Sequence, residues 1–124
     1  MPEIPIAVPI IIETMDEQEF KTEADRTLTS LYNKLVAASE SEGSEFEADF
    51  NSGALSIEFE EPPQKFVISP NTPVRQIWVS AHSRSFKLEW KAAQGAFVLP
   101  ETGATLAELM RGAISRQLGR EIAL

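Results

Sequence analysis

Apolar and polar residues alternate strictly along residues 74–90, VRQIWVSAHSRSFKLEW. This spacing predicts two strands joined by a short polar connection that contains His82. One apolar row then holds Ile77, Val79, Ala81, Phe86, Leu88 and Trp90. Because successive strand side chains face opposite sides, Trp78 falls in the polar row with Gln76 and Lys87. We interpret this large aromatic on a solvent face as a docking surface, and the alternative is an indole shielded by Lys87 or Arg75.

A helical period of 3.6 residues runs from Thr14 to about Glu40. Thr14 and Glu17 have the spacing of a capping box, and Gly43 with its neighbouring serines ends the helix. One predicted apolar stripe consists of Phe20, Ala24, Leu28, Leu31, Leu35 and Ala38.

A second helix is predicted from Thr105 to about Leu118, with Thr105 and Glu108 as its capping box and Gly119 as its stop. Its predicted apolar side holds Leu106, Leu109, Met110, Ala113 and Leu118. The remaining alternating segments predict strands at Phe46–Phe50, Leu55–Phe59, Phe66–Ser69 and Phe97–Leu99. We therefore expect an α+β two-layer sandwich, whose six-stranded antiparallel sheet is covered on one face by the N- and C-terminal helices.

Length and composition narrow the functional classes. The chain has 124 residues, no cysteine, one histidine and a net charge of −8. These numbers predict one domain, residues 14–124, and exclude thiolate metal sites, disulfides and multi-histidine centres. The net charge argues against nucleic-acid binding, and no pattern typical of an active site is present. Residues 1–13 form an apolar tail broken by prolines, unlike a signal peptide or a membrane span, so we expect a cytoplasmic bacterial protein and a monomer.

Charge is unevenly distributed along the chain. Between Glu13 and Asp49 there are eleven acidic and three basic residues, and between Lys65 and Arg120 three acidic and eight basic ones. Glu45, Glu47 and Asp49 alternate and share one predicted strand face, where carboxylate oxygens suit a hard cation. Alternatively, these acids maintain solubility, protect a strand edge, or pair with Arg26 and Lys34.

Several segments, taken together and in the same order along the chain, resemble the frataxin family, and most closely its bacterial branch. The resemblance covers residues 16–119. The matching segments are Glu19-Phe20 with Ala24-Asp25, Asn51–Leu55, Thr72–Ser80 with its PVRQIW run, Glu89-Trp90 and Thr105–Leu109. It implies a helix–sheet–helix fold, which agrees with the one derived from periodicity. It also implies an iron-associated regulator that binds the cysteine desulfurase and scaffold protein of iron–sulfur cluster assembly. Because the chain itself lacks the motifs of a catalytic site, we do not expect an enzyme.

The resemblance implies two sites. An acidic ridge would bind iron weakly, through Glu19, Glu23, Asp25, Glu40, Glu45, Glu47 and Asp49. The exposed sheet face would bind the partner through Trp78, Gln76, Asn51, Arg75 and Lys87. The chain departs from the family where Asn33, Val36 and Ala37 replace further helix acids. The alternative is a divergent protein-interaction module without an iron role.

Overall fold

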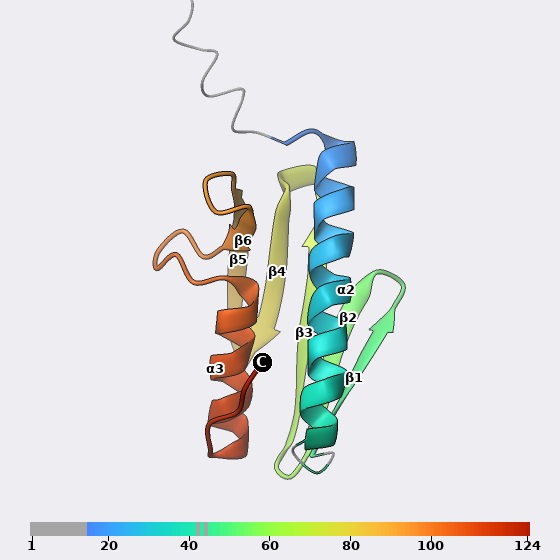
Figure 1. Cartoon of the computed structure of the whole chain (residues 1–124), viewed down its shortest axis with the longest axis vertical. Coiled ribbons are helices and arrows are strands. Elements are labelled where there is room, and N and C mark those ends of the chain that lie inside the picture. Colours follow the sequence, from blue (N-terminus) through green and yellow to red (C-terminus); the bar gives the residue numbers. More distant parts are fainter. Residues whose placement is uncertain (1–14, 42, 44) are drawn as a thin grey trace, which may run out of the picture.

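Two helices cover the same face of a six-stranded sheet in this computed structural model, which describes residues 15–41, 43 and 45–124 (Figure 1). The helices are α2 (Glu17–Ser41) and α3 (Leu106–Leu118). The strands are β1 (Phe46–Asn51), β2 (Ala54–Glu60), β3 (Pro63–Asn71), β4 (Gln76–Ala81), β5 (Arg84–Lys91) and β6 (Ala96–Val98). This is the predicted α+β sandwich. The predicted tail, residues 1–13, lies outside the described residues.

Each strand of the sheet pairs only with its neighbours in sequence, in the order β1 to β6 and always antiparallel. Several strand ends differ from the prediction, most by one residue. Strand β3 differs most, because it begins at Pro63, in the predicted turn and three residues before the predicted Phe66. Strand β3 continues through Pro70 to Asn71 before a short 3₁₀ turn, η2 (Thr72–Val74). Strand β6 ends at Val98, because the N–H of Leu99 donates to the carbonyl of Ala104 (2.9 Å) instead of to a strand.

The core lies between the sheet and the two helices. All six residues of the predicted stripe on α2 are buried, and Ile77, Val79 and Leu88 face them from the sheet. Phe20 of α2 meets Phe97 of β6 edge to face, with ring centres 5.7 Å apart. The predicted apolar side of α3 lacked Ile114, which is fully buried four residues after Met110.

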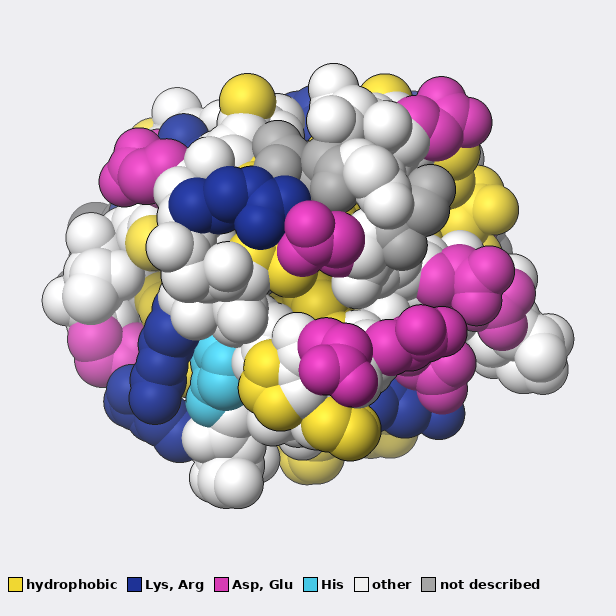
Figure 2. Space-filling view, turned by 90° about the horizontal axis from the view of Figure 1, so that it is seen from below, with side chains coloured by type: hydrophobic (Ala, Val, Ile, Leu, Met, Phe, Trp, Pro, Cys, Tyr) yellow, Lys and Arg dark blue, Asp and Glu magenta, His cyan; other side chains and the backbone are white. Residues whose placement is uncertain are grey.

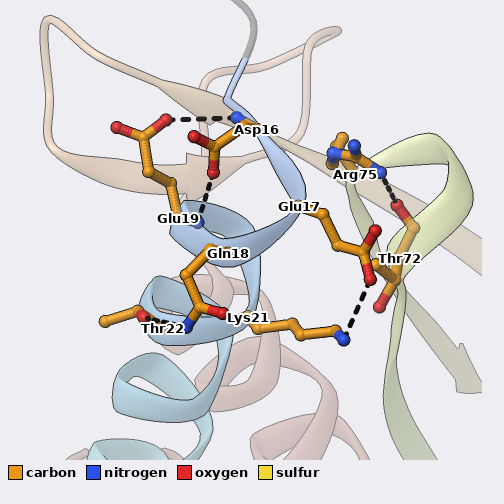
Figure 3. Close-up of polar contacts among 8 residues, drawn as sticks. All are labelled: Asp16, Glu17, Gln18, Glu19, Lys21, Thr22, Thr72 and Arg75. Carbon is orange, nitrogen blue, oxygen red and sulfur yellow. Dashed lines mark hydrogen bonds and ion pairs between the residues drawn. The ribbon is translucent and has the colours of Figure 1, made fainter.

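The start of α2 differs from the prediction. The backbone N–H of Glu19 donates to Asp16 (2.7 Å), and that of Asp16 donates to the Glu19 carboxylate (3.1 Å; Figure 3). This is a capping box two residues later than the predicted pair, of which Thr14 lies outside the described residues. Asp16 is as good an N-cap as threonine, and its negative charge also suits the helix dipole. Glu17 instead pairs with Lys21 at 2.9 Å.

The ends of α3 are as predicted. Thr105 and Glu108 form a reciprocal capping box, and Gly119 (φ 75°) ends the helix in the left-handed region. Beyond it, the chain returns between the two helices (Figure 1), where Ile122 is buried. Among the described residues, neither helix combines the length and the apolar character that crossing a bilayer requires.

Candidate functional site

Trp78 lies on the sheet face that the helices leave uncovered, as predicted, with 37% of its surface exposed. Its indole N–H donates to the side-chain oxygen of Gln76 (2.8 Å), two residues earlier on the same strand face. The amide nitrogen of Gln76 in turn donates to Glu89 on β5 (3.1 Å). The ring is therefore held in one orientation, although it is accessible to solvent.

Lys87 provides the third contact of the indole. It is the cross-strand partner of Trp78, and its ammonium lies 4.9 Å from the centre of the ring. This is the cation–π contact that we considered as an alternative to docking, and Lys87 makes it, not Arg75. The shielding is partial, because 37% of Trp78 stays exposed, more than of any other aromatic residue in the described chain.

Asn51 lies in the same outward row as Trp78. Asn51 pairs with Ala54 and Ser69 pairs with Trp78. Because Leu55 pairs with Ile68, Ala54 lies opposite Ser69, so the row crosses β1, β2, β3 and β4. At about 4.8 Å per strand, Asn51 and Trp78 lie roughly 14 Å apart. The residues between them, Ala54 and Ser69, have small side chains. Only small side chains therefore separate the amide of Asn51 from the indole of Trp78 and its neighbour Lys87.

Arg75 is directed toward the start of α2 (Figure 3). Its Nε donates to the carbonyl of Met15 (3.2 Å) and its guanidinium also donates to that of Thr72. Its own backbone is left-handed (φ 55°), at the end of η2. Among the predicted partner residues, the structure therefore brings together Trp78, Gln76 and Lys87, aligns Asn51 with them, and uses Arg75 to tie β4 to α2.

The predicted acidic residues lie on α2 and at β1, and several of them make separate polar contacts. Glu19 belongs to the capping box, Glu23 contacts Arg26 (3.5 Å), and Glu45 pairs with Arg120 (3.1 Å). Asp25 lies on the solvent side of α2, and Glu40 in its last turn. Four glutamates on β1, on β2 and directly before β1 line one surface hollow of about 570 Å³, namely Glu45, Glu47, Glu58 and Glu60. Acidic side chains also gather on one side of the end of the molecule shown in Figure 2.

A comparison with known protein families shows which family the chain belongs to. The pattern of the frataxin-like domain matches residues 13–120, which is most of the chain. The chain belongs to the frataxin family.

Curated relatives of this frataxin carry the name iron–sulfur cluster assembly protein CyaY. One from Azotobacter vinelandii is 31% identical over 83 residues, which are 65% of this chain and 74% of the relative. Another from Janthinobacterium sp. is 26% identical over 110 residues, which are 89% and 96% of the two chains. The family consists of assembly proteins and not enzymes, in agreement with the prediction that this chain is not an enzyme.

A solved structure supports the same fold. Frataxin from Psychromonas ingrahamii matches with a TM-score of 0.69 and 24% identity, over 87% of this chain and 96% of that one. The helix–sheet–helix arrangement, derived above from periodicity, is therefore the frataxin fold.

The acids of this frataxin do not form a closed metal site. Among residues 15–41, 43 and 45–124, no group of three or more Asp, Glu or His side chains could hold a metal ion. Glu47 faces Glu58 across the strand pair, while Glu58 lies 3.8 Å from Lys65 and Glu45 is paired with Arg120. Single carboxylates or pairs leave most positions around a hard cation to water. The described residues therefore do not fit a tightly bound resident iron.

Sequence reasoning missed two polar contacts. Glu89 orients Gln76, and only the strand register, in which Gln76 and Glu89 are directly opposite, could have indicated it. His82, predicted to be a simple connection residue, hydrogen-bonds Gln117 of α3 (3.0 Å) and packs against Phe66. The amide nitrogen of Gln117 donates to the carbonyl of Pro62 (3.0 Å), so Gln117 ties the turns at His82 and Pro62 to the helix.

Proposed function

We propose that this frataxin acts in iron–sulfur cluster assembly by docking its exposed sheet face on the cysteine desulfurase and its scaffold protein. The observation that carries the proposal is Trp78, exposed yet fixed by Gln76 and by Lys87. Aromatic side chains dominate the energy of protein interfaces, and a side chain held in place before binding loses little entropy on docking. The names of the relatives supply the pathway.

The composition of the surface supports a contact with a protein. The indole provides apolar area, Gln76 and Asn51 provide amides, and Lys87 provides a cation that a partner carboxylate can pair with. The acids of α2 and β1 would attract basic surfaces of the partner during encounter, because complementary charge raises association rates. We expect the protein to act as a monomer in the bacterial cytoplasm.

The experiment is a binding measurement with the desulfurase and scaffold of the same host. Trp78→Ala is expected to abolish binding and to lower the unfolding free energy only by about the 0.5–1 kcal/mol of its contact with Lys87, since the indole lies outside the core. Val74→Ala is the matched control, because Val74 is 51% exposed and lies in η2, outside the Trp78 row. Unaltered binding by Trp78→Ala would refute the docking face, and a large loss of stability would mean that Trp78 belongs to the core.

For iron, we propose weak binding of Fe²⁺ as cargo through single carboxylates of the predicted ridge, with water completing its coordination. The second candidate function, a protein-interaction module without an iron role, is favoured by the lack of a three-acid group in the described chain. Anaerobic calorimetry with Fe²⁺ distinguishes the two. Saturable heat that is lost on changing Glu19, Glu45 and Glu47 to glutamine, but kept in Glu101→Gln, supports cargo binding. No saturable heat supports the module.

A further inference from the structure

Half of β5 has a free edge. Strand β5 spans Arg84–Lys91, but β6 pairs with it only from Glu89 to Lys91. The chain leaves this edge at Leu99, whose N–H bonds to Ala104, and the next residue is Pro100. Within the described part of the chain, residues 84–88 therefore have β4 on one side and no strand on the other.

The hairpin between β4 and β5 determines which backbone groups point outward. His82 and Ser83 both have positive φ (51° and 62°), as in the two-residue turns that close on a hydrogen-bonded pair, here Ala81 and Arg84. Bonded and non-bonded pairs then alternate along an antiparallel ladder. The N–H and C=O groups of Ser85 and Lys87 are consequently directed to the free edge, in phase with Glu89, which pairs with Val98 of β6.

An apolar groove runs between this edge and α3. Its volume is about 290 Å³, and its apolar lining comes from Val79, Ala81, Phe86, Leu109, Met110 and Ala113. Phe86 belongs to the inward row of the sheet, yet it is only half-buried, and β6 does not pair with this part of β5. The free backbone groups thus border a space that accepts an apolar side chain.

Gly112 keeps the groove open. It lies within α3 and lines the groove, and a Cβ added there would meet no atom within 4 Å. Its φ is not positive, so the backbone geometry does not require glycine, and the space around it means that close packing does not require glycine either. A glycine inside a helix costs about 1 kcal/mol relative to alanine. The fold therefore gives no reason for a glycine at this position, whereas an occupant of the groove would.

Basic side chains border the groove. The guanidinium of Arg84 lies 5.0 Å from the centre of the Phe86 ring, and Arg116 lines the same groove from α3. Lys87 lies on the outer side of the edge. The one acid of the groove, Glu108, is used in the capping box of α3. Figure 2 shows Lys and Arg side chains next to His82 at this end of the molecule.

We propose that the free edge of β5 binds an extended, acidic and apolar segment of a partner protein as an added strand. Such a segment would exchange backbone hydrogen bonds with Ser85 and Lys87. Alternate apolar side chains would enter the groove beside Phe86, and the acidic ones between them would face the outer side and meet Lys87. Arg84 and Arg116, which line the groove itself, would attract the acidic segment as a whole. The edge shares Lys87 with the Trp78 face, but its free backbone groups and its groove belong to other residues, so the proposal does not depend on the proposed function.

The test uses the full chain and a fluorescent seven-residue peptide that alternates glutamate and valine. We expect saturable binding, with the amide resonances of Ser85 and Lys87 among those that shift most. Ser85→Pro removes an outward N–H, which an edge strand tolerates, and Gly112→Leu fills the groove. Each change is expected to weaken binding about tenfold, the equivalent of one lost hydrogen bond or apolar contact. The matched controls, Ser85→Ala and Val74→Ala, should bind as the parent does.

Several results would overturn the proposal. These are the absence of shifts at Ser85 and Lys87, unchanged affinity in a folded Ser85→Pro or Gly112→Leu protein, and equal binding of a peptide alternating lysine and valine. Concentration-dependent self-association that occupies the same amides would show that a second copy of the chain, not a partner segment, uses the edge. If Ser85→Pro fails to fold, Gly112→Leu alone decides.

Discussion

The ammonium of Lys87 lies 4.9 Å from the centre of the Trp78 ring, directly across the β4–β5 ladder. A cation on one side of an exposed indole restricts its motion and still leaves the rest of the ring available to a partner. The pair thus combines a contact within the chain with a surface for another molecule.

Removing this cation should loosen the indole without unfolding the protein. For Lys87→Ala we expect a loss of about 0.5–1 kcal/mol of unfolding free energy, the usual worth of an exposed cation–π contact. Acrylamide should quench the Trp78 fluorescence more strongly, because one side of the ring becomes accessible. Lys91→Ala, an exposed lysine on the same strand, is the control and should change neither quantity.

Glu89 should act as a positioning residue for Trp78. Its carboxylate holds the amide nitrogen of Gln76, which leaves the amide oxygen for the indole N–H. In Glu89→Ala, Gln76 is free to turn, so the indole N–H resonance of Trp78 should shift and exchange faster with solvent. Partner binding should weaken while the melting temperature stays close to that of the parent. An unchanged indole resonance would contradict this role.

Arg75 should contribute to stability more than to docking. Arg75→Ala loses the hydrogen bonds to Met15 and Thr72, and this loss should lower the unfolding free energy by roughly 1–2 kcal/mol. The alanine also keeps a Cβ atom at φ 55°. Arg75→Gly loses the same bonds but suits the left-handed backbone, so it should be more stable than Arg75→Ala by about 1 kcal/mol. Urea unfolding measures both, and equal stability of the two variants would contradict the backbone argument.

Glu17 should show a measurable pH effect. Lys21 donates a hydrogen bond to its carboxylate and attracts its charge, and both lower the pKa of Glu17 below the ordinary value. A lowered pKa in the folded state contributes stability that is present above the pKa of the unfolded chain and is lost as pH falls through the folded pKa. Lys21→Met should therefore raise the pKa of Glu17 in an NMR titration and remove this part of the acid dependence. The effect on stability should be small, because the pair is exposed.

The sequence allowed the fold to be predicted nearly completely, because its periodicities are long and regular. The six stripe residues from Phe20 to Ala38 are all buried, and the alternation around Trp78 places it correctly on the outer face. Boundaries were less predictable where local chemistry offers two solutions. Asp16 with Glu19 and Thr14 with Glu17 have the same capping spacing, so pattern alone does not distinguish them.

The contacts of the candidate site were less accessible from sequence, because they depend on register and on side-chain direction. The pattern predicted that Trp78, Gln76 and Lys87 share a face, but not that Glu89 would orient Gln76. Nor does spacing reveal that Arg75 turns toward Met15, sixty residues earlier in the chain. The acids of the ridge were predicted as a group, and the structure disperses them among a capping box and separate ion pairs.

The sequential order of the strands has a consequence for synthesis on the ribosome. Because every strand pairs only with neighbours in sequence, the sheet can assemble hairpin by hairpin as the chain emerges. Its apolar face, however, is covered in full only when α3 follows the last strand. Until then the nascent chain exposes Ala81 and Phe86, which line one groove with α3, to water. The appearance of this helix is therefore the step that protects the sheet from aggregation.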